Sequence, residues 1–213
     1  MGPYKSVDWK QLLSFVVPAL GIWLLAVGVR AMRPPALPEY FKVPEFSMLA
    51  AGEDGGAHFT QADLAGKVWI ADFIFTRCQG PCPSMSLAMA RLQAKLPKEV
   101  SFASVSVDPD FDTPQVMSEY ARRYAADMSR WIFLTPGKRE LYAFMREGLK
   151  LPVGENPAEP VGFQIMHSTK FVLIDAKGMV RGYFDVFDDD FYRDIEHAAR
   201  RLSAAPQVGG AAR

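Results

Sequence analysis

The two cysteines of the chain lie where an apolar segment meets the start of a helix, and this junction constrains the fold more than any other feature. Residues 68–75 read VWIADFIF, a nearly continuous apolar run that is typical of a strand buried on both faces of a parallel sheet. Pro83 suits the first turn of a helix, because the amide hydrogen that it lacks has no partner there. Since α/β folds place their sites at such junctions, we expect Cys78 and Cys82 to be reactive or metal-binding.

The spacing of the cysteines, C-x-x-x-C, limits which bonds and metal ions the pair can form or bind. On a regular helix such a pair would hold its Cβ atoms about 5–6 Å apart, whereas a disulfide needs about 3.8 Å. Gly80 and Pro81 indicate a turn instead, so an open dithiol and a closed disulfide are both geometrically possible. Two thiolates converging from a loop suit Cu(I) and also Zn(II). A purely structural disulfide, or two reduced core cysteines, is the alternative without a functional role.

The N-terminal part contains a second unusual feature, an uncharged apolar run at residues 12–29. At about 1.5 Å per residue this run is just long enough to cross a bilayer core. It exceeds the usual apolar region of a signal peptide, so it predicts an uncleaved anchor, although small residues near its end also permit cleavage. Basic residues flank it on both sides and give no orientation. We expect a membrane anchor at residues 1–33 and a stiff proline-rich linker at residues 34–40.

The remaining chain, residues 41–203, is long enough for one hydrophobic core, and residues 204–213 are expected to form a flexible tail. Strand and helix patterns alternate and then end in a β-hairpin and a last helix. A further hairpin is expected at residues 46–60 around a glycine-rich turn, and a loop at residues 151–164. The predicted fold is an α/β thioredoxin-like sandwich with an added N-terminal β-hairpin, preceded by one transmembrane helix.

Three segments of the chain resemble the signature motifs of the SCO/SenC family. They read DFIFTRCQGPCP at residues 72–83, VDPDFDTP at residues 107–114 and HSTKFVLID at residues 167–175. The motifs stand in the family's order, and the resemblance spans residues 46–202. Within the first motif, the three residues between the cysteines depart from the loop that many members carry.

The resemblance implies a membrane-tethered thioredoxin-like domain that faces the periplasm or the mitochondrial intermembrane space. It implies that Cys78, Cys82 and His167 bind copper, as Cu(I) or Cu(II), and that the protein helps build the dinuclear copper site of cytochrome c oxidase. The implied partners are the copper-site subunit of the oxidase, a thiol–disulfide redox partner and the membrane.

The position of His167 supports a metal site on its own. It precedes a predicted strand, where thioredoxin-type oxidoreductases usually carry a cis-proline that binds extended substrate opposite the cysteines. Here the sequence is MHST, without a proline, so an imidazole at this place favours a metal over a peptide. Two thiolates and one neutral imidazole give a net charge of −1 with Cu(I) and zero with Cu(II). A hydrogen-bonded loop histidine is the alternative.

Weaker candidates surround these three residues. Met85 and Met166 are near the proposed ligands and offer thioether sulfur, but a methionine there more often fills the core. Aspartates are candidate partners for the N–H group of the histidine, although turns and helix caps explain most of them: Asp72, Asp108, Asp112 and Asp175. His58 and His197 are expected at the surface.

Two functions follow from the sequence. The first is a copper-binding assembly factor, a metallochaperone rather than an enzyme. The second is a thiol–disulfide oxidoreductase that reduces cysteines of the oxidase subunit, with Cys78 as the attacking thiol. The chain has no glycine-rich phosphate loop, paired carboxylates or basic stripe, so nucleotide, sugar and nucleic-acid chemistry are not expected.

Overall fold

The computed structural model describes residues 16, 18, 20, 23, 36–52 and 55–204. The chain separates into two compact units, Met1–Ala36 and Leu37–Arg213. The predicted membrane span at residues 12–29 lies outside the described residues except at four isolated positions, and the predicted tail does so beyond residue 204. Within the described part of the chain, no helix combines the length and the apolar character that crossing a bilayer requires.

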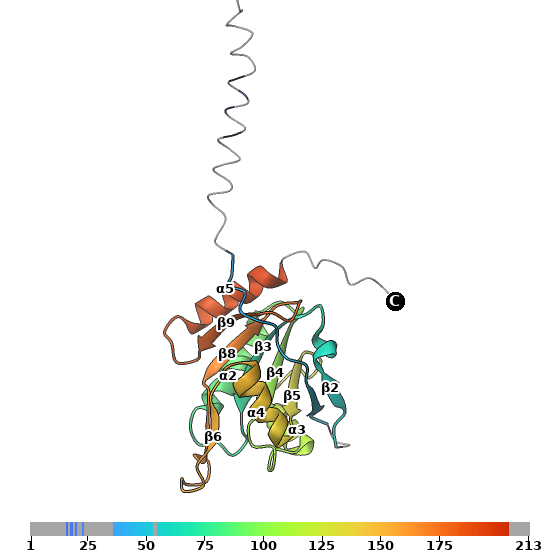
Figure 1. Ribbon diagram of the computed structural model, residues 1–213, viewed down its shortest axis with the longest axis vertical. Coiled ribbons are helices and arrows are strands. Elements are labelled where there is room, and N and C mark those ends of the chain that lie inside the picture. The colour runs from blue at the N-terminus through green and yellow to red at the C-terminus, as the bar shows by residue number, and fades with distance from the viewer. Residues whose placement is uncertain are drawn as a thin grey trace, which may run out of the picture. The chain divides into compact units, whose positions relative to one another are not determined.

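The second unit is built on a seven-stranded mixed sheet with the order β2-β1-β5-β4-β3-β8-β9 (Figure 1). The three central strands are mutually parallel, and the outer strands pair antiparallel. The strands of this sheet are β1 (Ser47–Ala50), β2 (His58–Thr60), β3 (Val68–Ile74), β4 (Val100–Ser106), β5 (Trp131–Thr135), β8 (Lys170–Ile174) and β9 (Val180–Asp185).

The predicted apolar strand is confirmed as β3, of which every residue is buried, as is every residue of its parallel neighbour β4. Strands in this position are covered by helices on both faces, which explains why their sequences lack a polar alternation. The expected N-terminal hairpin is also present, because β1 pairs antiparallel with β2. The thioredoxin-like α/β architecture is therefore confirmed for the described part of the chain.

Helices cover both faces of this sheet. On one face, α2 (Cys82–Lys95) contacts both α3 (Pro114–Arg123) and α5 (Phe191–Ser203). Ser86 of α2 lies 2.8 Å from the hydroxyl of Tyr120 in α3, and Arg91 stacks on Tyr192 of α5. On the other face, Phe144 packs near Phe73 of β3. It belongs to a π-helical turn (Ala143–Gly148) that continues α4 (Lys138–Tyr142).

The segment expected to be a loop at residues 151–164 differs from that prediction. It contains β6 (Val153–Glu155), which pairs antiparallel with β7 (Ile165–His167) in a separate two-stranded sheet. Figure 1 shows β6 away from the seven-stranded sheet. Strands of three residues flanked by proline and glycine are too short to show a period in the sequence, which is why the hairpin was missed. This hairpin, β6–β7 with its connecting loop, is called the histidine arm below.

Candidate metal centre

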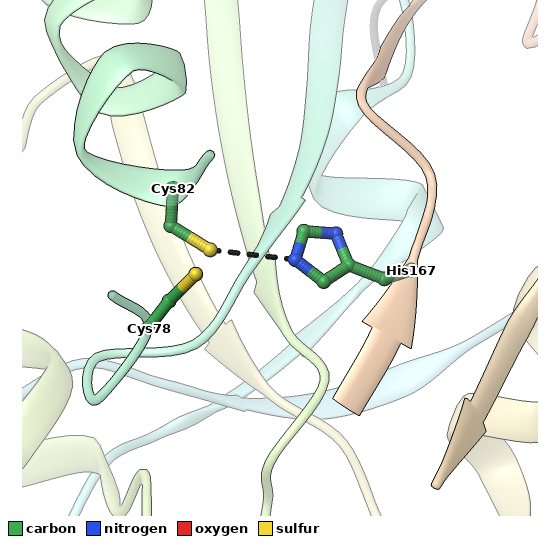
Figure 2. A group of neighbouring side chains, drawn as sticks. All are labelled: Cys78, Cys82 and His167. Carbon is green, nitrogen blue, oxygen red and sulfur yellow. Dashed lines mark hydrogen bonds between the residues drawn. The ribbon is translucent and has the colours of Figure 1, made fainter. Parts of the chain in front are cut away.

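The structure brings together all three residues that the sequence singled out. Cys78 lies in the loop after β3, Cys82 is the first residue of α2, and His167 is the last residue of β7. Figure 2 shows the three side chains pointing toward one another. Their ligand atoms lie within 4.8 Å of one another, and the Cys82 Sγ is 3.4 Å from the His167 Nε2. The histidine thus folds back over the cysteine pair.

A main-chain carbonyl orients the imidazole. The Nδ1 of His167 lies 3.0 Å from the carbonyl oxygen of Ser168. Because a carbonyl oxygen can only accept, Nδ1 carries the proton and donates it, and the lone pair of Nε2 faces the sulfurs. The edge of Phe75 packs against the ring at a centroid distance of 5.7 Å. The aspartates considered as partners for this N–H group do not accept it. A backbone carbonyl does, and no sequence pattern shows which carbonyl will do so.

The two thiols have different surroundings. Both are free; Cys82 is fully buried, whereas Cys78 is half-buried. Hydrogen bonds from the Cys82 thiol and from the amides of Cys82 and Gly80 lower the pKa of Cys78. Burial raises the pKa of Cys82, and so does the thiolate of Cys78. Without a metal, the pair therefore holds a thiolate at Cys78 and a protonated thiol at Cys82.

A buried carboxylate fixes the start of the cysteine loop. Asp112 is fully buried and accepts hydrogen bonds from the amide of Thr76 at 3.1 Å, from its hydroxyl at 2.5 Å and from the Ser106 hydroxyl at 2.6 Å. Burial raises the pKa of Asp112. The cap of α3 is the next residue, Thr113, whose side chain accepts a hydrogen bond from the Val116 amide. Asp112 instead ties the end of β3 to the loop after β4.

An ion pair also joins the same loops. The guanidinium of Arg77, immediately before Cys78, lies 2.6 Å from the Asp108 carboxylate and stacks 4.2 Å above the ring of Phe111. The second motif of the sequence therefore acts by holding the two residues that precede the first cysteine.

The histidine arm rests on the cysteine loop through its connecting segment. The carbonyl of Gly162 accepts a hydrogen bond from the amide of Gln79 at 3.3 Å. Gly162 has a φ of +95°, and a Cβ there would lie 2.8 Å from the Gln79 Cγ and 2.9 Å from the Arg77 oxygen. Only glycine fits this approach without strain. The contact was missed because residues 151–164 were expected to be an unstructured connection.

Asp72 lies in the sheet on β3 with no exposed surface. One carboxylate oxygen accepts the Ser104 hydroxyl at 2.6 Å, and the other has no hydrogen-bond partner among the described residues. Burial raises the pKa of Asp72 to about 7, and the nearby His167 opposes this shift. The group therefore holds its proton to near neutrality.

The remaining candidates do not join the cluster. Met85 is fully buried and fills the core, as expected. Met166 is 65% exposed, so the expectation that it fills the core was wrong. His58 is exposed and lies 3.3 Å from the Ser47 hydroxyl, and His197 is on α5.

The donor set fits a soft metal ion. An ion bonded to sulfur and nitrogen at about 2.0–2.3 Å holds its donors roughly 3.5–4 Å apart, so the set here closes around one ion with a contraction of about 1 Å. Two sulfurs and an imidazole nitrogen favour copper or zinc over Mg²⁺ and Ca²⁺, which prefer oxygen.

The sequence profile of the SCO1/SenC family matches residues 41–202. The chain belongs to the SCO1/SenC family. It is 34% identical over 190 residues to the SCO1 protein homolog of Bacillus subtilis, which covers 87% of this chain and 94% of the relative.

Two solved structures extend the comparison. The first is BsSco, described as a member of the Sco family of cytochrome c oxidase assembly proteins with a disulfide switch. It superposes with a TM-score of 0.67 at 30% identity, covering 81% of this chain and 98% of BsSco. The second is ScoI of Arabidopsis thaliana with copper bound, which shares the fold at a TM-score of 0.61 and 22% identity, covering 76% of this chain and 99% of that one.

Proposed function

We propose that this protein binds one copper ion through Cys78, Cys82 and His167 and helps assemble the dinuclear copper site of cytochrome c oxidase. The observation that carries the proposal is the convergence of the three donor atoms within 4.8 Å. Cys82 and His167 are 85 residues apart in the chain, so local sequence alone would not place them together. Membership of the family and the copper-bound relative support copper as the ion.

The three proposed ligands differ in burial and in the donor atom that they supply. Cys82 is a buried donor at the first turn of α2, where the helix dipole favours a thiolate once its proton has left. Cys78 is half-buried and is the donor that a recipient protein reaches from solvent. His167 supplies a neutral nitrogen whose tautomer is set by the Ser168 carbonyl. All three donors compete with protons, so the affinity for copper falls as the pH falls.

His167→Ala tests the three-donor set. The variant should lose affinity for copper by about 100-fold or more, because a two-coordinate thiolate pair remains. Titration with Cu(II) while sulfur-to-copper charge-transfer absorption is recorded measures both affinity and ligand identity. His197→Ala, on α5, is the matched control and should bind as the unmodified chain does. One copper per chain at unchanged affinity in His167→Ala would contradict the proposal.

A second function is favoured by the opposed pKa values of the two free thiols. We propose that the same pair reduces a disulfide of a partner protein. The Cys78 thiolate attacks one sulfur of that disulfide and releases the other as a thiolate, which takes a proton. Cys82 then loses its proton and attacks Cys78, so that the partner leaves as a dithiol and the pair is oxidised to a disulfide.

The two functions respond differently to substitution. Cys78→Ser and Cys82→Ser should abolish the reduction of a disulfide such as that of insulin, because each removes one of the two sulfurs exchanged. His167→Ala and removal of copper should change that rate little. If His167→Ala abolished disulfide reduction as completely as the cysteine replacements, the imidazole would belong to the exchange chemistry and the two functions would not be separable.

The organisation of the chain completes the proposal. Residues 1–33 anchor the protein in a membrane through a span at about residues 12–29, and residues 34–40 are a linker. Residues 41–203 form the copper-binding domain in the periplasm or the mitochondrial intermembrane space, and residues 204–213 are a tail. The uncharged run at residues 12–29 supports this arrangement. Fusion of a periplasm-dependent reporter after residue 204 tests the orientation.

A further inference from the structure

A groove of about 610 Å³ lies beside His167. Its walls come from the segment before β1, the segment before β6, the end of the histidine arm and strand β9. The side chains that form its apolar surface are Phe41, Leu151, Pro152, Met166 and Tyr183. Because His167 lines this groove as well as the metal centre, whatever occupies the groove touches a proposed copper ligand.

The histidine arm also carries a concentration of exposed apolar side chains. Val161 is 58% exposed, Phe163 51% and Met166 65%, all within one short segment. Single exposed apolar residues are ordinary, but a group of them on one short segment marks an interaction surface, and Met166 of this group also lines the groove. The arm has no need of these side chains for its own packing, since a two-stranded sheet has no core of its own to fill.

The charge around the groove is positive. Lys150 and Lys170 are the charged residues that line it. Lys170 lies 3.8 Å from Asp185, which partly neutralises it. The ammonium of Lys150 donates to the Glu147 carbonyl, and within the described ranges of the chain no carboxylate forms an ion pair with it. A ligand of this groove therefore has an apolar group next to a negative charge.

We propose that this groove binds an extended segment of the protein that receives copper, in which an apolar side chain stands beside a carboxylate. The apolar side chain fills the groove next to Met166, and the carboxylate meets Lys150. This proposal rests on the proposed function, because it assigns the groove to the copper recipient. Docking there would bring the recipient alongside His167 and the half-buried Cys78.

Two other occupants fit less well. A lipid bilayer is flat and meets protruding side chains, so it would leave a concave groove of this size unfilled. A second copy of the chain offers Phe187, which is 61% exposed, beside Asp188, Asp189 and Asp190. That acidic segment is already paired in part, since Asp190 lies 2.6 Å from Arg193.

The test uses the full chain in neutral phosphatidylcholine nanodiscs, with and without copper. The probe is the metal-free soluble domain of the cytochrome oxidase subunit that carries the dinuclear copper site, taken from the same organism. Met166→Ser and Lys150→Glu should each weaken binding of this probe by about tenfold, as the loss of a central apolar or charged contact does. Lys150→Glu should also remove most of the dependence of affinity on salt.

Matched controls lie at the opposite end of the parallel strands. Met128→Ser changes a methionine that is 44% exposed before β5, and Lys98→Glu reverses an exposed charge before β4. Neither residue lines the groove, so both controls should bind the probe as the unmodified chain does. All four variants should keep one copper per chain with unchanged charge-transfer absorption, since none replaces a ligand.

The possible results separate the proposals. The docking proposal is overturned if both groove variants bind the probe within twofold of the unmodified chain, or if the unmodified chain does not bind it. The proposed function is judged separately, by whether the chain binds copper. Effects seen only in nanodiscs with anionic lipid assign the groove to the membrane and overturn the docking proposal. The docking proposal is also overturned if sedimentation shows that the chain self-associates and that Met166→Ser and Phe187→Ser both abolish this association. Failure of copper loading with intact docking overturns the proposed function alone.

Discussion

The cysteines and the histidine belong to two regions that are held in different ways. The cysteine loop follows β3, all of whose residues are buried, and its first residues are fixed by the buried Asp112. The histidine arm is a separate two-stranded sheet, and the residues of β7 are exposed or half-buried. The cysteine side of the metal centre is therefore anchored in the core, whereas the histidine side belongs to a surface hairpin.

Because of this difference, we expect substitutions in the two regions to affect stability and binding to different extents. Substitutions on the cysteine side should lower the free energy of unfolding, because they disturb buried groups. Substitutions of exposed side chains on the histidine arm should alter binding of metal or partner and leave the free energy of unfolding nearly unchanged. The predictions below follow this comparison from the largest effect on stability to the smallest.

Asp72→Asn should have the largest effect, and it depends on pH. Burial raises the pKa of Asp72 to about 7 in the folded state, whereas the ordinary pKa of an aspartate, as in the unfolded chain, is 3.8. Between these values the folded state binds more protons, so the free energy of unfolding falls as the pH rises, by at most about 4 kcal/mol. Urea denaturation of the metal-free chain from pH 4 to pH 8 should show this fall, and Asp72→Asn should flatten it. An unchanged pH profile in Asp72→Asn would show that Asp72 is already ionised.

Asp112→Ala should destabilise the protein by about 3 kcal/mol, because it leaves the Thr76 amide and the hydroxyl groups of Thr76 and Ser106 without their acceptor. Chemical denaturation measures this loss, and copper titration should show weaker binding because the cysteine loop is released. Asp110→Ala is the control, since its side chain is 73% exposed and pairs with Lys138 at the surface. Equal losses in the two variants would remove the distinction between the buried and the exposed carboxylate.

Gly162→Ala should destabilise the protein by about 2 kcal/mol, because it combines a left-handed backbone with close contacts. The arm must lift from Gln79 to admit the methyl group, so copper affinity should fall as well. Gly137→Ala is the control, because a Cβ at Gly137 meets nothing within 4 Å and its φ is −68°. If Gly162→Ala left copper affinity unchanged, the contact between the arm and the cysteine loop would not position His167.

Phe163→Ser should change the free energy of unfolding by less than about 0.5 kcal/mol, as exposed positions usually do. Leu87→Ser, at a residue of α2 that is 63% exposed, should behave in the same way and serves as the control. A loss of more than about 2 kcal/mol in Phe163→Ser would place the arm within the cooperative core, since only buried apolar groups contribute that much. The comparison between the two regions would then fail.

Much of the site could be read from the sequence because its signals are local. The apolar run of β3, the turn at Gly80 and Pro81, and a proline in the first turn of α2 depend on neighbouring residues only. They fixed the strand–helix junction, with α2 beginning one residue earlier than Pro83 suggested. Leu87 shows the limit of this reasoning: it is an apolar residue of α2, yet its side chain faces solvent.

The sequence by itself determined the α/β class, the reactive cysteine pair and, through its three motifs, the likeness to a family of copper-binding proteins. Only the tertiary structure decided that the histidine closes over the sulfurs, that the Ser168 carbonyl rather than an aspartate orients it, and that Gly162 seats the arm on the cysteine loop. The physical reason is that these contacts either join residues distant in the chain or are made by backbone groups. Every residue type carries those groups, so no sequence pattern records which of them will meet.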